Sequence, residues 1–303
     1  MRAAVLLPLL SGCLIVDTYE EGVGEVCPEM RPEALASAAG PLAVFGDQIY
    51  YERTPTTLSR ISTSGGAITD LVNIEQPAIT LVVDASGAYW GATDNTLTKA
   101  PLTGAIKTLI AYNLTNLTNI TVDDVGLVYA AGGLFRVRHA DNTTEMLAPA
   151  ELVSGLAQYA GTYFFADVGL GVIRRAPPVV DLAFATYPGP VVVDDRALYY
   201  YEYGNPNDAM GAIRVMDPNG GEPMEVVSRM FSPVVSMVMD ADNVFYATDV
   251  VGDYRIKQLS RASGEVKLLA CNFTPDAFVY LAQDDAFVYW SDTVQIYRAP
   301  KVN

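Results

Sequence analysis

The chain has 303 residues, of which half are hydrophobic, and 19 basic against 35 acidic residues give a net charge of −16 at pH 7. This length allows two ordinary domains or one large repeat domain, and the apolar content is sufficient for a substantial core. A surface this acidic repels phosphate backbones, so we expect no nucleic-acid partner.

The first residues have the organisation of a secretory signal. Arg2 is the only positive charge there, and the apolar run at residues 3–10 follows it. The run is too short to span a bilayer, which takes about 20 apolar residues, but it suits the hydrophobic region of a signal peptide.

The sequence LSGC at residues 10–13 resembles a bacterial lipobox. The resemblance implies a lipoprotein signal peptide at residues 1–12, cleavage before Cys13, and acylation of its thiol. Two or three acyl chains anchor stably, because each buried methylene contributes about 0.8 kcal/mol. The residue after the cysteine is Leu14 and not Asp, and in this the sequence resembles lipoproteins that are sent to an outer membrane. We therefore expect a bacterial cell-envelope protein that meets the membrane through its lipid anchor only. A plain signal, or a buried N-terminal strand with a free thiol, is the alternative.

Residues 13–23 are expected to form a tether, and residues 24–303 a single repeat domain. From about residue 41 a unit of some forty residues recurs, marked by aromatic pairs whose second members lie 39, 39, 36, 36, 45 and 44 positions apart. This period is typical of a propeller blade of four strands. The seven marks are Tyr50-Tyr51, Tyr89-Trp90, Val128-Tyr129, Phe164-Phe165, Tyr200-Tyr201, Phe245-Tyr246 and Tyr289-Trp290.

The context of each mark is also repeated. An apolar run that mostly ends in Asp precedes it, and we expect these Asp side chains to cap the turn between the first two strands. A third strand with a basic residue, a tight turn and a closing apolar strand follow it in most copies. The basic residues are Arg60, Lys99, Arg136, Arg174, Arg214, Lys257 and Arg298.

Four short antiparallel strands form a sheet that cannot bury both faces alone, whereas sheets packed around an axis bury them against their neighbours. The sequence therefore predicts an all-β, seven-bladed β-propeller. The seventh copy has only three strands before the chain stops at Asn303. Residues 24–30 lie in the register of a fourth strand, so we expect them to pair beside residues 292–300 and close the ring.

Only Cys27 and Cys271 remain as cysteines after Cys13. In an oxidising compartment such a pair is a disulfide candidate, and two buried free thiols are the alternative. Ring closure of this kind would bring the two cysteines close together.

The sequence YWSD at residues 289–292 resembles the YWTD motif, and Tyr89-Trp90 begins a looser copy. The repeat region, from about residue 41 to residue 303, resembles the YWTD- and NHL-like β-propellers, especially those that bacteria export. The resemblance implies a binding module, since these families are mainly of that kind.

The sequence offers little catalytic chemistry, and we assign no catalytic residue. His139 is the only histidine, which rules out a histidine-rich metal site, and no G-x-S-x-G elbow supports Ser-His-Asp catalysis. Abundant Asp and Glu leave open a carboxylate- or Ca²⁺-dependent hydrolase or lyase that uses the central channel. Apart from Ca²⁺ in that alternative, we expect neither a metal nor a cofactor.

Two long connections between second and third strands, at residues 202–211 and 248–254, depart from the repeat. Loops on a rigid scaffold often carry function. The candidate ligand contacts are Tyr203, Asn205, Asp208, Asp249, Asp253 and Tyr254.

We therefore expect a monomeric, lipid-anchored module that binds or scaffolds another protein or a surface glycan. The channel enzyme and a structural envelope component without a ligand are the alternatives. Acidic residues that converge on one mouth of the channel would favour the enzyme, and a smooth channel with an apolar or tyrosine-rich rim would favour the binding module.

Overall fold

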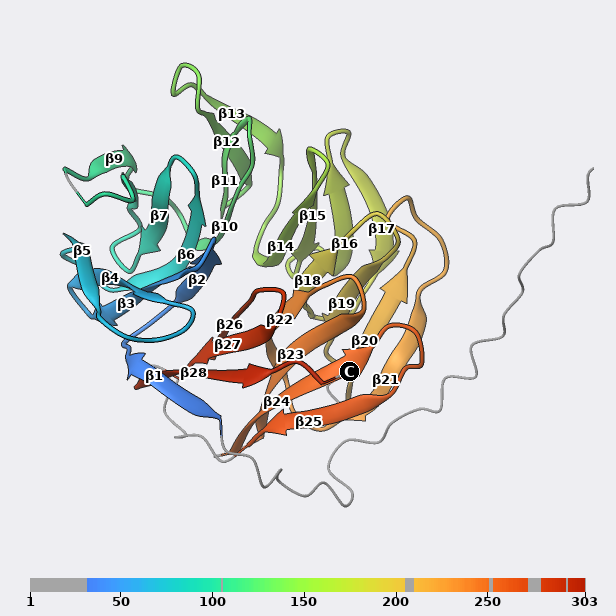
Figure 1. The fold of residues 1–303 in the computed structure, drawn as a ribbon. Coiled ribbons are helices and arrows are strands. Elements are labelled where there is room, and N and C mark those ends of the chain that lie inside the picture. Colours follow the sequence, from blue (N-terminus) through green and yellow to red (C-terminus); the bar gives the residue numbers. More distant parts are fainter. Residues whose placement is uncertain are drawn as a thin grey trace, which may run out of the picture.

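The structure is a computed structural model that describes residues 32–104, 106–204, 210–250, 253–271, 279–292 and 294–302. These residues form seven antiparallel sheets of four strands each around a common axis (Figure 1). The described residues contain no helix, and therefore no helix long and apolar enough to cross a membrane. The chain is a seven-bladed β-propeller, as the repeat predicts.

Blades are numbered in chain order, and within each blade the first strand is the innermost. Blades 1 to 3 consist of β2 (Leu42–Phe45), β3 (Gln48–Thr54), β4 (Thr57–Ser62) and β5 (Thr69–Asn73); β6 (Ala78–Asp84), β7 (Gly87–Ala92), β8 (Leu97–Ala100) and β9 (Thr108–Ala111); and β10 (Leu117–Val122), β11 (Gly126–Ala131), β12 (Leu134–Arg138) and β13 (Thr144–Ala148). Blades 4 to 6 consist of β14 (Val153–Tyr159), β15 (Thr162–Asp167), β16 (Val172–Ala176) and β17 (Val180–Phe184); β18 (Pro188–Val193), β19 (Leu198–Glu202), β20 (Gly211–Met216) and β21 (Met224–Met230); and β22 (Val234–Met239), β23 (Asn243–Val250), β24 (Asp253–Ser260) and β25 (Val266–Ala270). Blade 7 consists of β26 (Tyr280–Gln283), β27 (Phe287–Ser291), β28 (Gln295–Pro300) and β1 (Glu33–Ser37).

The core consists of the junctions between blades. The inner strands contact one another in a closed cycle, from β2 through β6, β10, β14, β18, β22 and β26 back to β2. Seven clusters of buried apolar residues occur, and each one spans two neighbouring blades. Every residue of β7 and β11 is buried, because a second strand is covered on both faces of its sheet.

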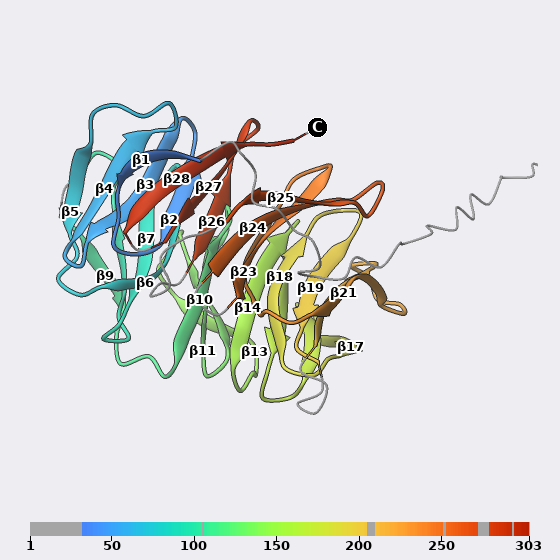
Figure 2. The ribbon, with the colours of Figure 1, turned by 90° about the horizontal axis from the view of Figure 1, so that it is seen from below.

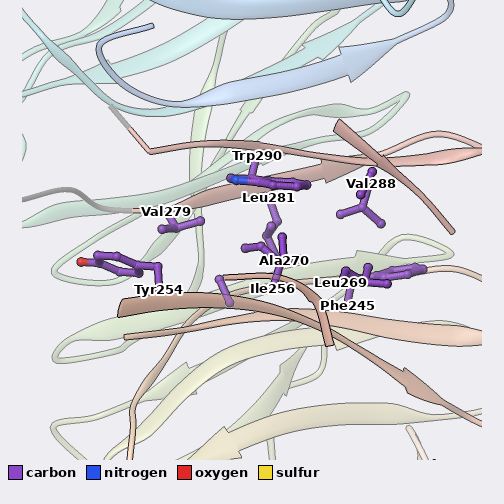
Figure 3. Packing of buried hydrophobic residues seen from close by; sticks show 11 residues of the cluster. Phe245, Tyr254, Ile256, Leu269, Ala270, Val279, Leu281, Val288 and Trp290 are labelled. Atoms are coloured by element: carbon purple, nitrogen blue, oxygen red, sulfur yellow. The ribbon is translucent and has the colours of Figure 1, made fainter. Parts of the chain in front are cut away.

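Figure 3 shows the cluster between blades 6 and 7, where Trp290 lies over Leu281 and Phe245 lies beside Leu269 on the other side of the cluster. The Trp290 and Phe245 side chains are completely buried. Truncating a buried aromatic residue of this kind to alanine costs about 3–5 kcal/mol. The aromatic marks of the repeat therefore stabilise the packing between blades.

The ring is closed by an N-terminal strand added to the last blade, with the order β1-β28-β27-β26. Figures 1 and 2 both show β1 beside β28. The prediction that residues 24–30 supply this strand is wrong, since β1 occupies the edge of β28; residues 24–30 themselves lie outside the described residues. Glu33–Ser37 contains no proline, whereas residues 24–30 include Pro28, which cannot donate a hydrogen bond to a strand ladder.

Side-chain contacts also define β1 as the outer strand of blade 7. Glu33 lies opposite Arg298, and its carboxylate is 2.7 Å from Arg298 Nη2. The same cross-strand pair occurs in blade 3, where Arg136 lies opposite Glu145. Leu35 packs against the cluster between blades 7 and 1.

Strand register corrects one of the aromatic marks. In blade 5 the residues equivalent to Phe245-Tyr246 are Tyr199-Tyr200, one position before the expected pair, since Val192 faces Tyr199 as Val238 faces Phe245. Three adjacent tyrosines made this position ambiguous in the sequence.

The basic residues of the third strands occupy two different positions. Arg60, Lys99, Arg136 and Arg298 lie opposite the first member of each mark. Arg174, Arg214 and Lys257 lie opposite the second member. Because side chains alternate along a strand, the two groups face opposite neighbouring blades.

Ring closure can be tested by shortening the N-terminus at two points. Removal of residues 1–37 deletes β1 and exposes the partners of Leu35, so we expect a loss of about 2–3 kcal/mol in the free energy of unfolding. Removal of residues 1–31 keeps β1 and serves as the control. Both shortened chains lack Cys27, so no disulfide at this residue affects the comparison. Equal urea midpoints for the two chains would contradict the role of β1.

Candidate functional site

The two ends of the propeller carry different connections. The turns between first and second strands and between third and fourth strands lie at one end, which is named the turn face. The connections between second and third strands, and the crossovers from blade to blade, lie at the other end, which is named the crossover face. This division follows from the antiparallel pairing in every blade.

The turn face is organised by aspartate caps, as the sequence predicts. In blade 7, Asp284 Oδ1 accepts hydrogen bonds of 2.8 Å from the backbone N–H groups of Ala286 and Phe287. The same pair of bonds recurs in four other blades, so a carboxylate closes each of these turns. The aspartates are Asp84, Asp123, Asp194, Asp240 and Asp284.

Ionisable groups do not gather into a metal site in the part of the chain that the structure describes, where no group of three or more His, Cys, Asp or Glu could hold an ion. His139 lies on the turn face, with Nε2 3.1 Å from the carbonyl oxygen of Asp123. A Ca²⁺ role for the acidic residues stays an untested alternative.

The central channel is chemically neutral along its described walls. A cavity of about 590 Å³ lies between the first strands of blades 2 to 7. Its polar lining residues are hydroxyl and amide side chains, and the rest of the lining is apolar or glycine. These polar residues are Thr80, Thr118, Asn119, Ser154, Ser236 and Tyr280. No carboxylate lies among the lining residues, so they do not supply the acid–base pair of a glycoside hydrolase.

One buried carboxylate influences the channel from blade 1. Glu52 is 1% exposed, and its Oε2 accepts a 2.8 Å hydrogen bond from the Ala78 N–H. Burial raises the pKa of Glu52 to about 7, although the bond from Ala78 acts in the opposite direction. Burial, and then the charge of Glu52, raise the pKa of the channel residue Tyr280 to about 12.

The structure brings together some of the predicted contact residues. Tyr203 is exposed on the crossover face, and its pKa is raised by burial and then by the charge of Asp249 from blade 6. Tyr203 also lies edge-on to Tyr201, with ring centroids 5.1 Å apart.

The other predicted contacts have different outcomes. The ends of β23 and β24 pair with each other, with Asp249 opposite Tyr254 and Val250 opposite Asp253. The Tyr254 side chain is buried in the cluster between blades 6 and 7 and belongs to the core. Asn205 and Asp208 lie outside the described residues.

The crossover face carries exposed aromatic residues that the sequence analysis did not select. Phe184, Tyr187, Tyr203 and Phe231 are 41–86% exposed and lie where the chain leaves or enters strands of blades 4 to 6; these four residues are named the aromatic rim. Leu152, Leu170 and Met210 are exposed on the same face. The sequence did carry a signal, because these apolar residues lie at or next to the ends of strands, where polar residues are more usual.

A backbone contact places two members of the rim side by side. The Tyr203 N–H donates to the carbonyl oxygen of Tyr187 at 3.3 Å. The Asp249 N–H donates to the carbonyl oxygen of Pro233, two residues after Phe231. Tyr187 has a φ of 47°, a left-handed conformation that is unfavourable for a bulky side chain. The rim therefore presents exposed rings on neighbouring connections of blades 4 to 6, with Tyr187 at a strained position.

Comparisons with known proteins support the fold. No protein-family model and no curated protein matches the chain. Similar solved structures include the extracellular domain of BT4673 from B. thetaiotaomicron, with a TM-score of 0.69 and 10% identity over 90% of this chain and 40% of that chain. PorZ, an essential bacterial surface component of the type-IX secretion system of Porphyromonas gingivalis, gives a TM-score of 0.63 and 11% identity over 89% and 38%. The computationally designed Ika8 protein gives 0.62 and 13% over 89% and 98%.

At these identities the likeness establishes the fold alone, and the chain spans about two fifths of the BT4673 and PorZ chains. The class of protein is thus a seven-bladed β-propeller, a fold that often serves as a binding or scaffold module. Its structural neighbours include extracellular and bacterial surface components.

The environment of Glu52 can be tested through pH. The folded chain holds the Glu52 proton up to a pKa of about 7, whereas the unfolded chain releases it near the ordinary value of 4.5. The contribution of protonated Glu52 to the free energy of unfolding is therefore fully present below about pH 4.5 and is lost as the pH rises through 7. We expect Glu52→Gln to be more stable than the native chain by about 2–3 kcal/mol at pH 8, and equal to it at pH 4. Glu222→Gln, at an exposed position, controls for net charge. A difference that does not change with pH would refute this assignment.

Proposed function

We propose that the protein is a lipid-anchored cell-envelope module that binds a partner protein through the aromatic rim of its crossover face. The exposure of Phe184, Tyr187, Tyr203 and Phe231 on one face is the observation that carries this proposal. Contiguous exposed apolar surface on a soluble domain marks interaction sites, and aromatic residues are prominent at interface hot spots.

A partner protein fits this surface better than the channel alternatives do. The crossover face also exposes the apolar side chains of Leu152, Leu170 and Met210, and this composition suits a dehydrated protein interface. The neutral lining of the channel argues against a hydrolase or lyase that works through two channel carboxylates. A surface glycan, or no ligand at all, is an outcome of the test below.

The envelope location rests on the sequence and on the neighbours. Cys13 in its lipobox-like context would carry the acyl chains, and β1 begins at Glu33. A connecting segment of this length reaches at most roughly 65 Å when fully extended. Such a tether would let the propeller turn its crossover face toward partners beside the membrane. The extracellular and surface-component neighbours are consistent with this location, and the outer membrane follows from Leu14 as a proposal.

A disulfide would fasten the tether to the ring. Cys271 follows β25 and is disulfide-bonded, and the other half of the bond lies outside the described residues. We assign Cys27 as the partner, because Cys13 is assigned to the lipid. Cys27 precedes Glu33 by six residues, which span up to roughly 20 Å, enough to pass from blade 7 to blade 6.

Matched variants test the binding face. The whole chain, with Cys13→Ala to prevent acylation, is used to capture proteins from envelope extract, and candidates are then measured in purified form. Tyr187→Asn with Phe231→Ser is expected to weaken binding about a thousandfold, since hot-spot aromatics contribute at least about 2 kcal/mol each when truncated and about 1.4 kcal/mol is tenfold. Tyr159→Asn, an exposed tyrosine on the turn face, is the control and should bind normally.

Stability separates loss of a contact from loss of the fold. Asparagine tolerates the left-handed conformation better than tyrosine, so Tyr187→Asn should leave the free energy of unfolding unchanged or raise it by up to about 1 kcal/mol. Equal binding by the rim variant and the control would exclude the rim, and capture of glycan alone would replace the protein partner by a carbohydrate.

Mass spectrometry tests the anchor and the disulfide together. Non-reducing digestion of the exported chain should yield one cross-linked peptide containing Cys27 and Cys271, and an N-terminal peptide that begins with acylated Cys13. Removing a disulfide that closes so long a loop is expected to cost about 2–5 kcal/mol of stability. Two unmodified thiols at 27 and 271 would eliminate the bond, and an unacylated N-terminus would eliminate the anchor.

A further inference from the structure

Each turn-face aspartate has a second carboxylate oxygen, Oδ2, and at two junctions this oxygen binds a basic side chain of the next blade. At the junction of blades 5 and 6, Asp194 Oδ2 lies 2.5 Å from Arg261 Nη1. At the junction of blades 6 and 7, Asp240 Oδ2 lies 2.7 Å from Lys301 Nζ. Arg261 and Lys301 are equivalent residues, because each comes directly after the third strand of its blade. The backbone N–H of each also donates to the carbonyl oxygen of the residue two positions after the turn aspartate of its own blade. This position is named the cation position.

Both cations are also held by an aromatic ring. The guanidinium of Arg261 lies 5.5 Å from the ring centroid of Tyr199, and Lys301 Nζ lies 5.2 Å from that of Phe245. Burial alone would raise the pKa of the Asp194 carboxyl, but hydrogen bonds from Arg261 and from two backbone N–H groups outweigh it and bring the pKa to about 2. Two junctions of this chain therefore bind a basic side chain between an aspartate and a ring.

At the junction of blades 2 and 3 the cation position holds His139. Its backbone N–H donates to Val125 in the same register as Arg261 and Lys301 do to their turns. The imidazole is shorter than either basic side chain. Its Nε2 stays 3.9 Å from Asp84 Oδ2, and its ring centroid is 6.0 Å from that of Tyr89.

The outer oxygen of Asp84 is consequently different from the others. Asp123 Oδ2 and Asp284 Oδ2 accept 2.6 Å hydrogen bonds from the hydroxyls of Tyr163 and Tyr289. Of the five turn aspartates, Asp84 alone has no donor within hydrogen-bond distance of Oδ2 among the described residues.

A cavity of about 950 Å³ opens beside this oxygen, lined by residues of both blades. Its apolar walls include Ile110, Val122, Leu127 and Val137, which are suited to the methylenes of a long side chain. Ile106 also lines this cavity, is 89% exposed and offers a contact for a neighbouring apolar residue of a ligand.

The two long cations in the lining are already engaged. Lys99 Nζ donates to Ser86 Oγ at 3.2 Å and lies 4.8 Å from the Tyr89 ring centroid. Arg138 is paired with Glu145 at 2.9 Å. Neither contact reaches Asp84 Oδ2, and Asp123 and Asp124 add negative charge to the same cavity.

We propose that the cavity between blades 2 and 3 is a binding site for a lysine or arginine side chain of a partner polypeptide. The incoming cation would bind Asp84 as Arg261 binds Asp194, its stem would pack on the apolar walls, and an adjacent apolar residue would contact Ile106. The net charge of −16 favours encounter with a basic partner. This site is on the turn face and is independent of the aromatic rim.

The single histidine of the chain provides a direct probe, because its ring signals in an NMR spectrum are unique and lie in the cavity. The whole chain with Cys13→Ala, without a histidine tag, is titrated at fixed pH with N-acetyl-leucyl-lysine amide. We expect a saturable shift of the His139 ring signals. N-acetyl-leucyl-norleucine amide has the same four-carbon stem without the ammonium group, so it lacks the charge and should bind about tenfold more weakly.

Two substitutions locate the effect. Asp84→Asn keeps the Oδ1 cap but removes the charge, and should weaken the lysine probe about tenfold. Asp284→Asn is the matched control, since its Oδ2 already has a tyrosine partner, and should change nothing. The proposal is overturned if both probes shift the His139 signals equally, if Asp84→Asn binds as well as the native chain, or if N-acetyl-leucyl-glutamate amide binds in preference to the lysine probe.

An independent measurement uses the chain itself as the ligand. His139→Arg restores a long cation to the cation position, and we expect a thermal midpoint about 2–4 °C higher as the new side chain reaches Asp84. Arg196→Lys, an exposed conservative change on the same face, is the control. A midpoint that is unchanged or lower in His139→Arg would show that Asp84 does not accept a cation from this direction.

Discussion

The structure depends on one constraint, namely that a four-stranded sheet with two apolar faces must be covered on both sides. Each blade meets this requirement only through its neighbours, and the seven apolar clusters accordingly lie between blades. A ring is the arrangement in which no blade is left with an uncovered face. The strand β1 completes blade 7 and closes the ring by pairing with β28. The ion pair between Glu33 and Arg298 supports this pairing.

The same constraint separates structure from function. Side chains within the blades pack against neighbouring blades. Even polar residues such as Glu52 and Lys257 are therefore buried there, and Tyr254 belongs to the core. The connections at the two faces do not have to fill the space between blades. At the turn face the connections are short and are closed by aspartate caps of the same geometry. At the crossover face their sequences differ, and some of them carry exposed aromatic rings.

The junctions between blades also show how a candidate site arises where one repeat lacks the long basic side chain that two others have. Arg261 and Lys301 join neighbouring blades at the turn face, and each satisfies an aspartate of the preceding blade. His139 has the same backbone position but a shorter side chain, and a cavity is present where the other two junctions hold a cation. The lone histidine, which has no catalytic context in the sequence, thus has a structural explanation and marks a candidate site.

The sequence alone determined the number of blades, the all-β class, the closure of the ring by an N-terminal strand and the caps formed by Asp84 and its equivalents. These features are local or periodic, so they are visible as spacing and residue type. Tertiary structure decided that Glu33–Ser37 is the closing strand, that Arg174 and Arg136 face opposite blades, and that the aromatic rim and the Asp84 cavity exist. Each of these depends on register or on contacts between blades, and a one-residue difference in register moves a side chain to the other face of the sheet.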